Sequence, residues 1–124
     1  MLVSCKKTIE KAQENILVQA MINGQWKITN FTVNSADITS DFNTYKFQYF
    51  ADKTVNAINN SSVEKTGNWD GDIASRTTWA SFSNASYPLT LINGSWLITD
   101  NTWTYVTATQ TNGAETKTMR LEKQ

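Results

Sequence analysis

The stretch INGQWKIT at residues 22–29 returns almost unchanged as INGSWLIT at residues 92–99, with six of eight letters shared. In each copy the tryptophan and the isoleucine two residues later fall on one face of an extended chain. A glycine before a strand lets the backbone take a positive φ or approach its neighbour closely, and a tryptophan covers a wide area. We therefore expect two strands that begin alike, with tryptophans that plug the core. Direct ligand contact by these tryptophans is the alternative.

Turn signals recur about every 8–12 residues after Gly24, which is typical of an all-β sandwich or barrel. Asp-Gly at 70–71 and Asn-Gly at 112–113 predict tight hairpin turns. Eight strands in up-and-down order close most simply into a barrel, which leaves no exposed edge. The predicted fold is an all-β, eight-stranded antiparallel barrel, and a two-sheet β-sandwich is the alternative. The expected strands are residues 25–33, 45–49, 54–58, 63–69, 73–82, 95–99, 103–110 and 115–123.

The segment before the barrel has a helical pattern, because Ile9, Ala12, Ile16 and Ala20 recur at near-helical spacing. It predicts a short helix that plugs one end of the barrel, with a stalk as the alternative. We divide the chain into residues 1–5, a helix or tether at 6–23, and one barrel domain at 24–124.

Composition excludes several classes of function. The chain has 124 residues, no histidine, one cysteine, and 11 basic against 11 acidic residues. Without histidine, a Ser-His-Asp or Cys-His catalytic arrangement is impossible and the commonest metal ligand is missing. No basic face indicates nucleic-acid binding, and no apolar stretch is long enough to span a bilayer. We expect no enzymatic activity, cofactor or metal.

Two carboxylate pairs remain as candidates for chemistry, since glycosidases need only two acids. These are Asp37 with Asp41, and Asp70 with Asp72. All four fall in predicted turns, where aspartate is favoured because it bonds to the backbone. Turn formation is therefore the preferred interpretation over catalysis or a weak cation site at 68–72.

The first residues, Leu2-Val3-Ser4-Cys5, are similar to the lipobox of bacterial lipoproteins. The resemblance implies that a signal peptide is cut before Cys5, which then carries the lipid. Such a protein is anchored to a membrane surface of the cell envelope, in particular the outer membrane, without spanning it. A chance cysteine is the alternative.

Three Gly-x-Trp triplets, at 24–26, 67–69 and 94–96, and the stretch KFQYFADKTV at 46–55 resemble the small lipocalin-like bacterial lipoproteins. The resemblance implies that Arg120 on the last strand packs against Trp26 and that this contact closes one end of the barrel. The repeated octapeptide gives Trp96 a matching barrel-closing role. Strand alternation, in contrast, places Arg120 on the face opposite Met119 and Leu121.

The resemblance also implies binding of a small apolar ligand, because an eight-stranded barrel holds either packed side chains or one small molecule. The candidate ligand-binding residues are Phe47, Tyr49, Trp79, Trp103 and Tyr105. If these rings are only core, the barrel is solid. Its work, as an inhibitor or accessory protein, then falls to the long loops at 34–43 and 83–91.

Overall fold

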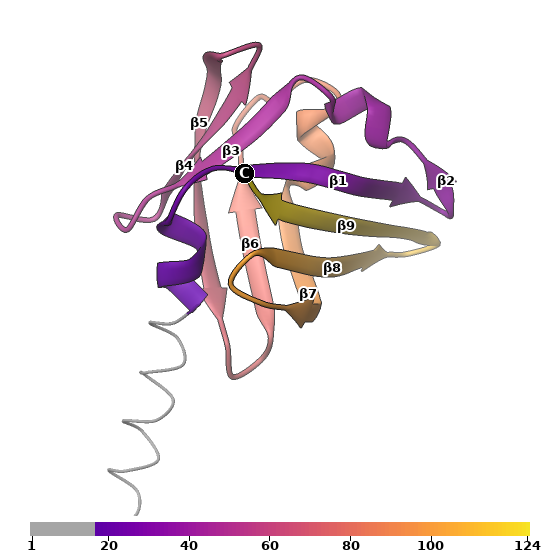
Figure 1. Ribbon diagram of the computed structural model, residues 1–124. Helices are drawn as coiled ribbons and strands as arrows, with labels where there is room; N and C mark the ends of the chain where they lie inside the picture. Colours follow the sequence, from indigo (N-terminus) through magenta and orange to yellow (C-terminus); the bar gives the residue numbers. More distant parts are fainter. Residues whose placement is uncertain (1–16) are drawn as a thin grey trace, which may run out of the picture.

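The computed structural model describes residues 17–124 (Figure 1). This part of the chain begins with a helical segment at residues 17–22 and continues as strands with two short 3₁₀ helices. The strands are β1 (Trp26–Val33), β2 (Ala36–Asp37), β3 (Tyr45–Tyr49), β4 (Thr54–Asn59), β5 (Ser62–Asp72), β6 (Thr77–Ser81), β7 (Gly94–Asn101), β8 (Tyr105–Asn112) and β9 (Glu115–Lys123). The 3₁₀ helices are η1 (Thr39–Phe42) and η2 (Leu89–Ile92).

The sheet closes on itself. From β3 to β9 each strand pairs antiparallel with the next along the chain, and β1 pairs with both β3 and β9. The β1–β9 register runs from Trp26 opposite Lys123 to Val33 opposite Lys117. The predicted eight-stranded up-and-down barrel is thereby confirmed, and β2 is a two-residue addition at the edge of β1.

Two predicted turns lie elsewhere. Asp70 and Gly71 are inside β5, opposite Trp79 and Thr78, and the chain turns at residues 73–76 instead. Gly71 faces the helical segment, where a Cβ would lie 3.0 Å from Leu17 Cδ2. The lack of a side chain at Gly71 allows this close packing, and sequence alone does not distinguish a packing glycine from a turn glycine. At the last hairpin Asn112 pairs with Glu115, so the turn residues are 113–114.

The two ends of the barrel are closed by different elements, as Figure 1 shows. We call the end covered by residues 17–22 the helix end, and the end covered by η1 and η2 the loop end. Near the helix end the ring centroids of Tyr49 and Trp69 lie 5.1 Å apart. At the loop end Phe31 contacts both Phe42, at 4.9 Å, and Trp96, at 5.9 Å.

The repeated octapeptide builds the same local structure at both ends. Gly24 and Gly94 have φ of 89° and 110°, which lets a helical turn lead directly into a strand. The indole N–H of Trp26 then donates to the carbonyl of Met21 at 2.9 Å. The indole N–H of Trp96 donates likewise to Ile92 at 2.8 Å. Because β1 and β7 run in opposite directions, Trp26 plugs the helix end and Trp96 the loop end.

Candidate functional site

The lumen is filled by large side chains. Those with less than 2% exposure include Trp26, Trp69, Trp96, Phe31, Phe42, Phe47 and Phe82. Between the helical segment and the sheet lies an apolar cavity of about 30 Å³, bordered by Leu17, Met21 and Tyr49 among others. That is room for about one or two water molecules. Pockets for drug-sized ligands are roughly ten times larger.

The structure does not bring the five predicted ligand-binding residues together. Phe47 and Tyr49 are buried in the lumen. Trp79 borders the cavity but is 42% exposed, and Trp103 is 54% exposed in the turn before β8. Tyr105 lies on the outer face, since its neighbour Val106 points inward. The inward positions of β6 and β8 are taken by small side chains, which fit between the large rings of the other strands.

Arg120 does not pack against Trp26, so the contact implied by the lipocalin resemblance is wrong. On β9 Met119 and Leu121 are buried and Arg120 faces outward, as strand alternation predicts. Its guanidinium carbon lies 4.0 Å from the ring centroid of Tyr105. The cation over Trp26 is instead Lys123, with Nζ at 5.2 Å from the ring centroid.

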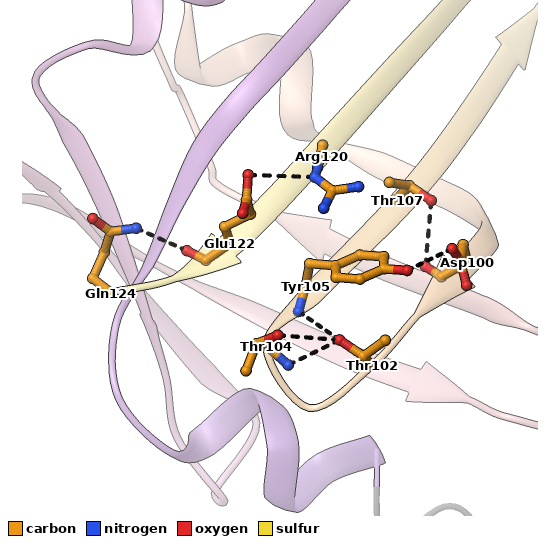
Figure 2. Close-up of polar contacts among 8 residues, drawn as sticks. All are labelled: Asp100, Thr102, Thr104, Tyr105, Thr107, Arg120, Glu122 and Gln124. Carbon is orange, nitrogen blue, oxygen red and sulfur yellow. Dashed lines mark hydrogen bonds and ion pairs between the residues drawn. The ribbon is translucent and has the colours of Figure 1, made fainter.

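Arg120 and Tyr105 belong to a polar cluster on the outside of β7–β9, drawn in Figure 2. The Tyr105 hydroxyl donates to Asp100 at 2.7 Å, and this hydrogen bond is the main cause that raises the pKa of Tyr105. The Arg120 Nε donates to Glu122 at 3.3 Å. Thr102 Oγ1 accepts from the backbone N–H of Tyr105 at 3.2 Å. These bonds fix the β7–β8 turn, which presents Trp103 to solvent.

A lysine accompanies each Gly-x-Trp tryptophan. Besides Lys123 over Trp26, Lys53 Nζ lies 5.3 Å from the Trp69 ring and Lys117 Nζ 5.9 Å from the Trp96 ring. Lys117 is itself buried, with 7% exposure, and donates to the Leu91 carbonyl of η2 at 3.1 Å. This hydrogen bond joins β9 to η2 beneath the loop end. No sequence signal marked Lys117, because lysines at strand positions are ordinarily exposed.

Three of the four candidate carboxylates, Asp37, Asp70 and Asp72, bond to backbone N–H groups, a threonine hydroxyl or a lysine. Asp37 Oδ1 accepts from the N–H and hydroxyl of Thr39, and these bonds lower its pKa. Asp72 accepts from the N–H of Ala74 at 3.0 Å. Asp70 lies within β5, so the prediction that it lies in a turn is wrong. Its carboxylate pairs with Lys53 Nζ at 2.9 Å. In residues 17–124 no group of three or more acidic, cysteine or histidine side chains could hold a metal ion.

The two long loops meet at the loop end. The hydroxyl of Tyr87 donates to Asp41 Oδ2 at 2.5 Å, which joins residues that are 46 positions apart. Below this contact Phe42 and Leu89 are fully buried. We call the exposed residues above it the loop surface. We define it by six exposed residues of the two loops, which are Asp37, Ser40, Asp41, Asn84, Ser86 and Tyr87. Neither loop contains a lysine or arginine.

Comparison with known proteins gives evidence on the fold and on nothing else. No family model matches the chain, and no curated protein matches it. The structure is similar to the crystal structure of a DUF4847 family protein from Bacteroides vulgatus ATCC 8482, with a TM-score of 0.62 and 11% sequence identity. The similarity covers 87% of this chain and 99% of that one. An all-β barrel of this kind therefore exists in a solved structure.

The membrane-related predictions concern the start of the chain. Cys5 lies outside the described residues. Among residues 17–124 no helix is long and apolar enough to cross a membrane.

Proposed function

We propose that this protein is a solid-barrel binding module of the bacterial cell envelope, which engages a protein partner through the loop surface. The observation that carries the proposal is the hydrogen bond between Tyr87 and Asp41, which fixes two long loops against each other. The filled lumen supports it, because the cavity that residues 17–124 leave beneath the helical segment, of about 30 Å³, is too small for a sizeable ligand.

The loop surface has the features of a protein-binding site. Tyr87 is 59% exposed although its hydroxyl is already bonded. Tyrosine is enriched among residues that dominate binding energy, and a contact that orders a loop before binding lowers the entropic cost of association. The loop surface itself carries two aspartates and no basic side chain, and Lys65 stands at its margin, where it donates to the Ser83 carbonyl at 2.8 Å. We therefore expect a partner with a neutral or basic contact face.

Attachment to the envelope rests on the lipobox-like residues 2–5. A lipid on Cys5 holds the barrel at a membrane surface, where the effective concentration of an envelope partner is high. Incorporation of labelled palmitate into the wild-type protein, and its loss in Cys5→Ser, is the expected result. Equal labelling of both proteins contradicts the anchor.

Site-specific photo-crosslinking in the native cell tests the protein-binding function. A crosslinking residue at position 87 should capture one protein that the same residue at position 103, on the exposed β7–β8 turn, does not capture. Binding of that purified partner should weaken at least about tenfold in Tyr87→Ala, as for a hot-spot residue. Asp41→Asn should weaken it less, and Trp103→Ala should leave it unchanged. Equal capture at both positions, or full affinity in Tyr87→Ala, rejects the loop surface.

Carriage of a small apolar ligand is the second candidate function. The observation that favours it is the apolar lining of the cavity beneath the helical segment, with Leu17 and Met21 on the helix side. Displacement of that segment would enlarge the cavity at the helix end. Native mass spectrometry of the gently purified protein decides between the two functions. A stoichiometric small apolar molecule without a carboxylate head group supports the carrier, and an unliganded mass rejects it.

A further inference from the structure

A groove of about 320 Å³ lies in the barrel wall beside β3. In the described chain β1 and β3 pair at one position, Trp26 opposite Phe47, whereas β3 and β4 pair along their whole length. The two strands separate beyond that pair, and the groove occupies the space. Lys46 and Ile58, which line it, alternate with the inward-facing Phe47 and Ala57, so the groove opens to the outside.

Hydrogen bonds hold the walls of this groove in place. Lys27 Nζ, from β1, donates to the carbonyl of Asn43 at 2.8 Å. The N–H of Asn60, in the β4–β5 turn, donates to the carbonyl of Thr44 at 3.0 Å. Residues 43 and 44 therefore tie β1 to the β4–β5 hairpin across the end of the groove. A site whose walls are already bonded needs little ordering when a ligand binds.

The charged side chains that line the groove have one sign. Lys27 and Lys46 line it, and none of the described lining residues is acidic. Two carboxylates stand nearby without lining the groove, and only Glu122 is paired with a cation. Glu64 accepts hydrogen bonds from Tyr45 at 2.8 Å and from Asn59 at 2.9 Å. Glu122, opposite Lys27 on β9, accepts from Arg120 at 3.3 Å. The groove therefore attracts an anion.

The other chemical feature of the groove is apolar. Ile58 and Val63 contribute aliphatic surface, and Val63 is 54% exposed. An exposed valine beside two lysines suits a ligand with a charged head and an apolar chain, since both parts then find a complementary surface. The volume of about 320 Å³ is at the lower limit of small-molecule pockets.

We propose that the groove binds a small amphiphile with a single carboxylate head group and a short alkyl chain. The ammonium groups of Lys27 and Lys46 bind the carboxylate, and the chain lies on Ile58 and Val63. This site is separate from the lumen and from the loop surface. Its ligand is therefore independent of the proposed protein partner.

Sodium octanoate is the probe, because it carries one carboxylate and a short chain. We expect its titration into ¹⁵N-labelled protein to shift the amide signals of Lys27, Lys46 and Val63 saturably, with a dissociation constant of about 1 mM. Octyl glucoside, which has the chain without the charge, and inorganic phosphate, which has charge without a chain, should each bind at least about tenfold more weakly. Those two controls separate the head group from the chain.

Exposed residues allow matched variants that keep the fold. Lys46→Gln and Val63→Asn should each weaken octanoate binding about tenfold. Lys53→Gln and Leu97→Asn change a lysine and an exposed aliphatic residue outside the groove, and should bind octanoate as wild type does. Three outcomes overturn the proposal. They are equal binding of octyl glucoside or phosphate, full affinity in both groove variants, and shifts confined to lumen residues such as Ile98 and Val106.

Discussion

Lys123, the last residue of the barrel, lies with its ammonium 5.2 Å from the ring centroid of Trp26, the first residue of the barrel. The two residues are also paired in the β1–β9 ladder. The Trp26 indole N–H meanwhile bonds to Met21. One tryptophan thus joins the helical segment, the first strand and the last strand.

Trp26→Phe should therefore loosen the helix end. The substitution leaves the Met21 carbonyl without its indole donor and removes part of a buried ring, with an expected loss of about 1–3 kcal/mol in unfolding free energy. Hydrogen exchange should rise at residues 17–22 but not at 89–92, and Trp96→Phe should give the reverse pattern. Urea unfolding measures the loss of unfolding free energy. Trp103→Phe, on an exposed ring, is the control and should stay within about 0.5 kcal/mol of wild type.

Arg120→Ala should cost less than about 1 kcal/mol, because an exposed cation over an aromatic ring and a surface ion pair each contribute little. The guanidinium contacts Tyr105 and Glu122 on the outer face, not the plugging tryptophan. Urea unfolding again provides the measurement. A loss of more than about 2 kcal/mol would mean that Arg120 does close the barrel in solution, as in the lipocalin pattern.

Gly67→Ala should be more damaging than Gly71→Ala. A Cβ on Gly67 would lie 2.3 Å from the backbone oxygen of Ser81 and 2.8 Å from Phe82. Neither backbone nor a packed ring can move easily, so we expect a loss of about 1–3 kcal/mol or more. At Gly71 the near atom is the flexible end of Leu17, at 3.0 Å. Thermal or urea unfolding of both variants checks the order, and equal losses would contradict the packing.

Stability should fall in alkaline solution between about pH 10 and 12. Burial, aided by the hydrogen bond to Glu64, raises the pKa of Tyr45 to about 12 from 10.0. The unfolded state loses this proton first, so the contribution is complete below about pH 10 and disappears as pH rises through the folded-state value. Burial raises the pKa of Tyr49 as well.

Tyr45→Phe tests this dependence, because phenylalanine keeps the ring and cannot ionise. The drop in unfolding free energy between about pH 9 and 11.5 should become smaller. The remainder belongs to the other tyrosines whose pKa is raised, Tyr49 by burial and Tyr87 and Tyr105 mainly by hydrogen bonds to aspartates. Tyr87→Phe, at an exposed position, is the control and should leave most of the drop in place. An unchanged slope in Tyr45→Phe would show that Tyr45 ionises equally in both states.

The barrel could be predicted from sequence because its strands alternate and its turns are short. Trp26 with Ile28, and Trp96 with Ile98, do face inward together as the octapeptide suggests. The alternation of Met119 and Leu121 around Arg120 was also a better guide to the last strand than the family resemblance.

The sequence did not predict which side chains of β6 and β8 face into the lumen. Ala80 and Ala108 face inward because large rings from other strands already fill the lumen, so Trp79 and Tyr105 face outward. That choice depends on the summed volume of eight strands, which no local pattern contains. The contact between Tyr87 and Asp41, and the separation of β1 from β3, likewise arise only when distant segments are placed together.

The pairing of β9 with β1 also has a consequence for synthesis. Residues at the start of the barrel pair with strand residues that are synthesised about a hundred positions later, since Trp26 pairs with Lys123. On the ribosome, strands β3 to β8 can form hairpins one after another as they emerge. The ring itself stays open, with β1 exposing an unpaired edge, until β9 has left the exit tunnel. Any nascent chain stalled before that point is a candidate for chaperone binding or aggregation.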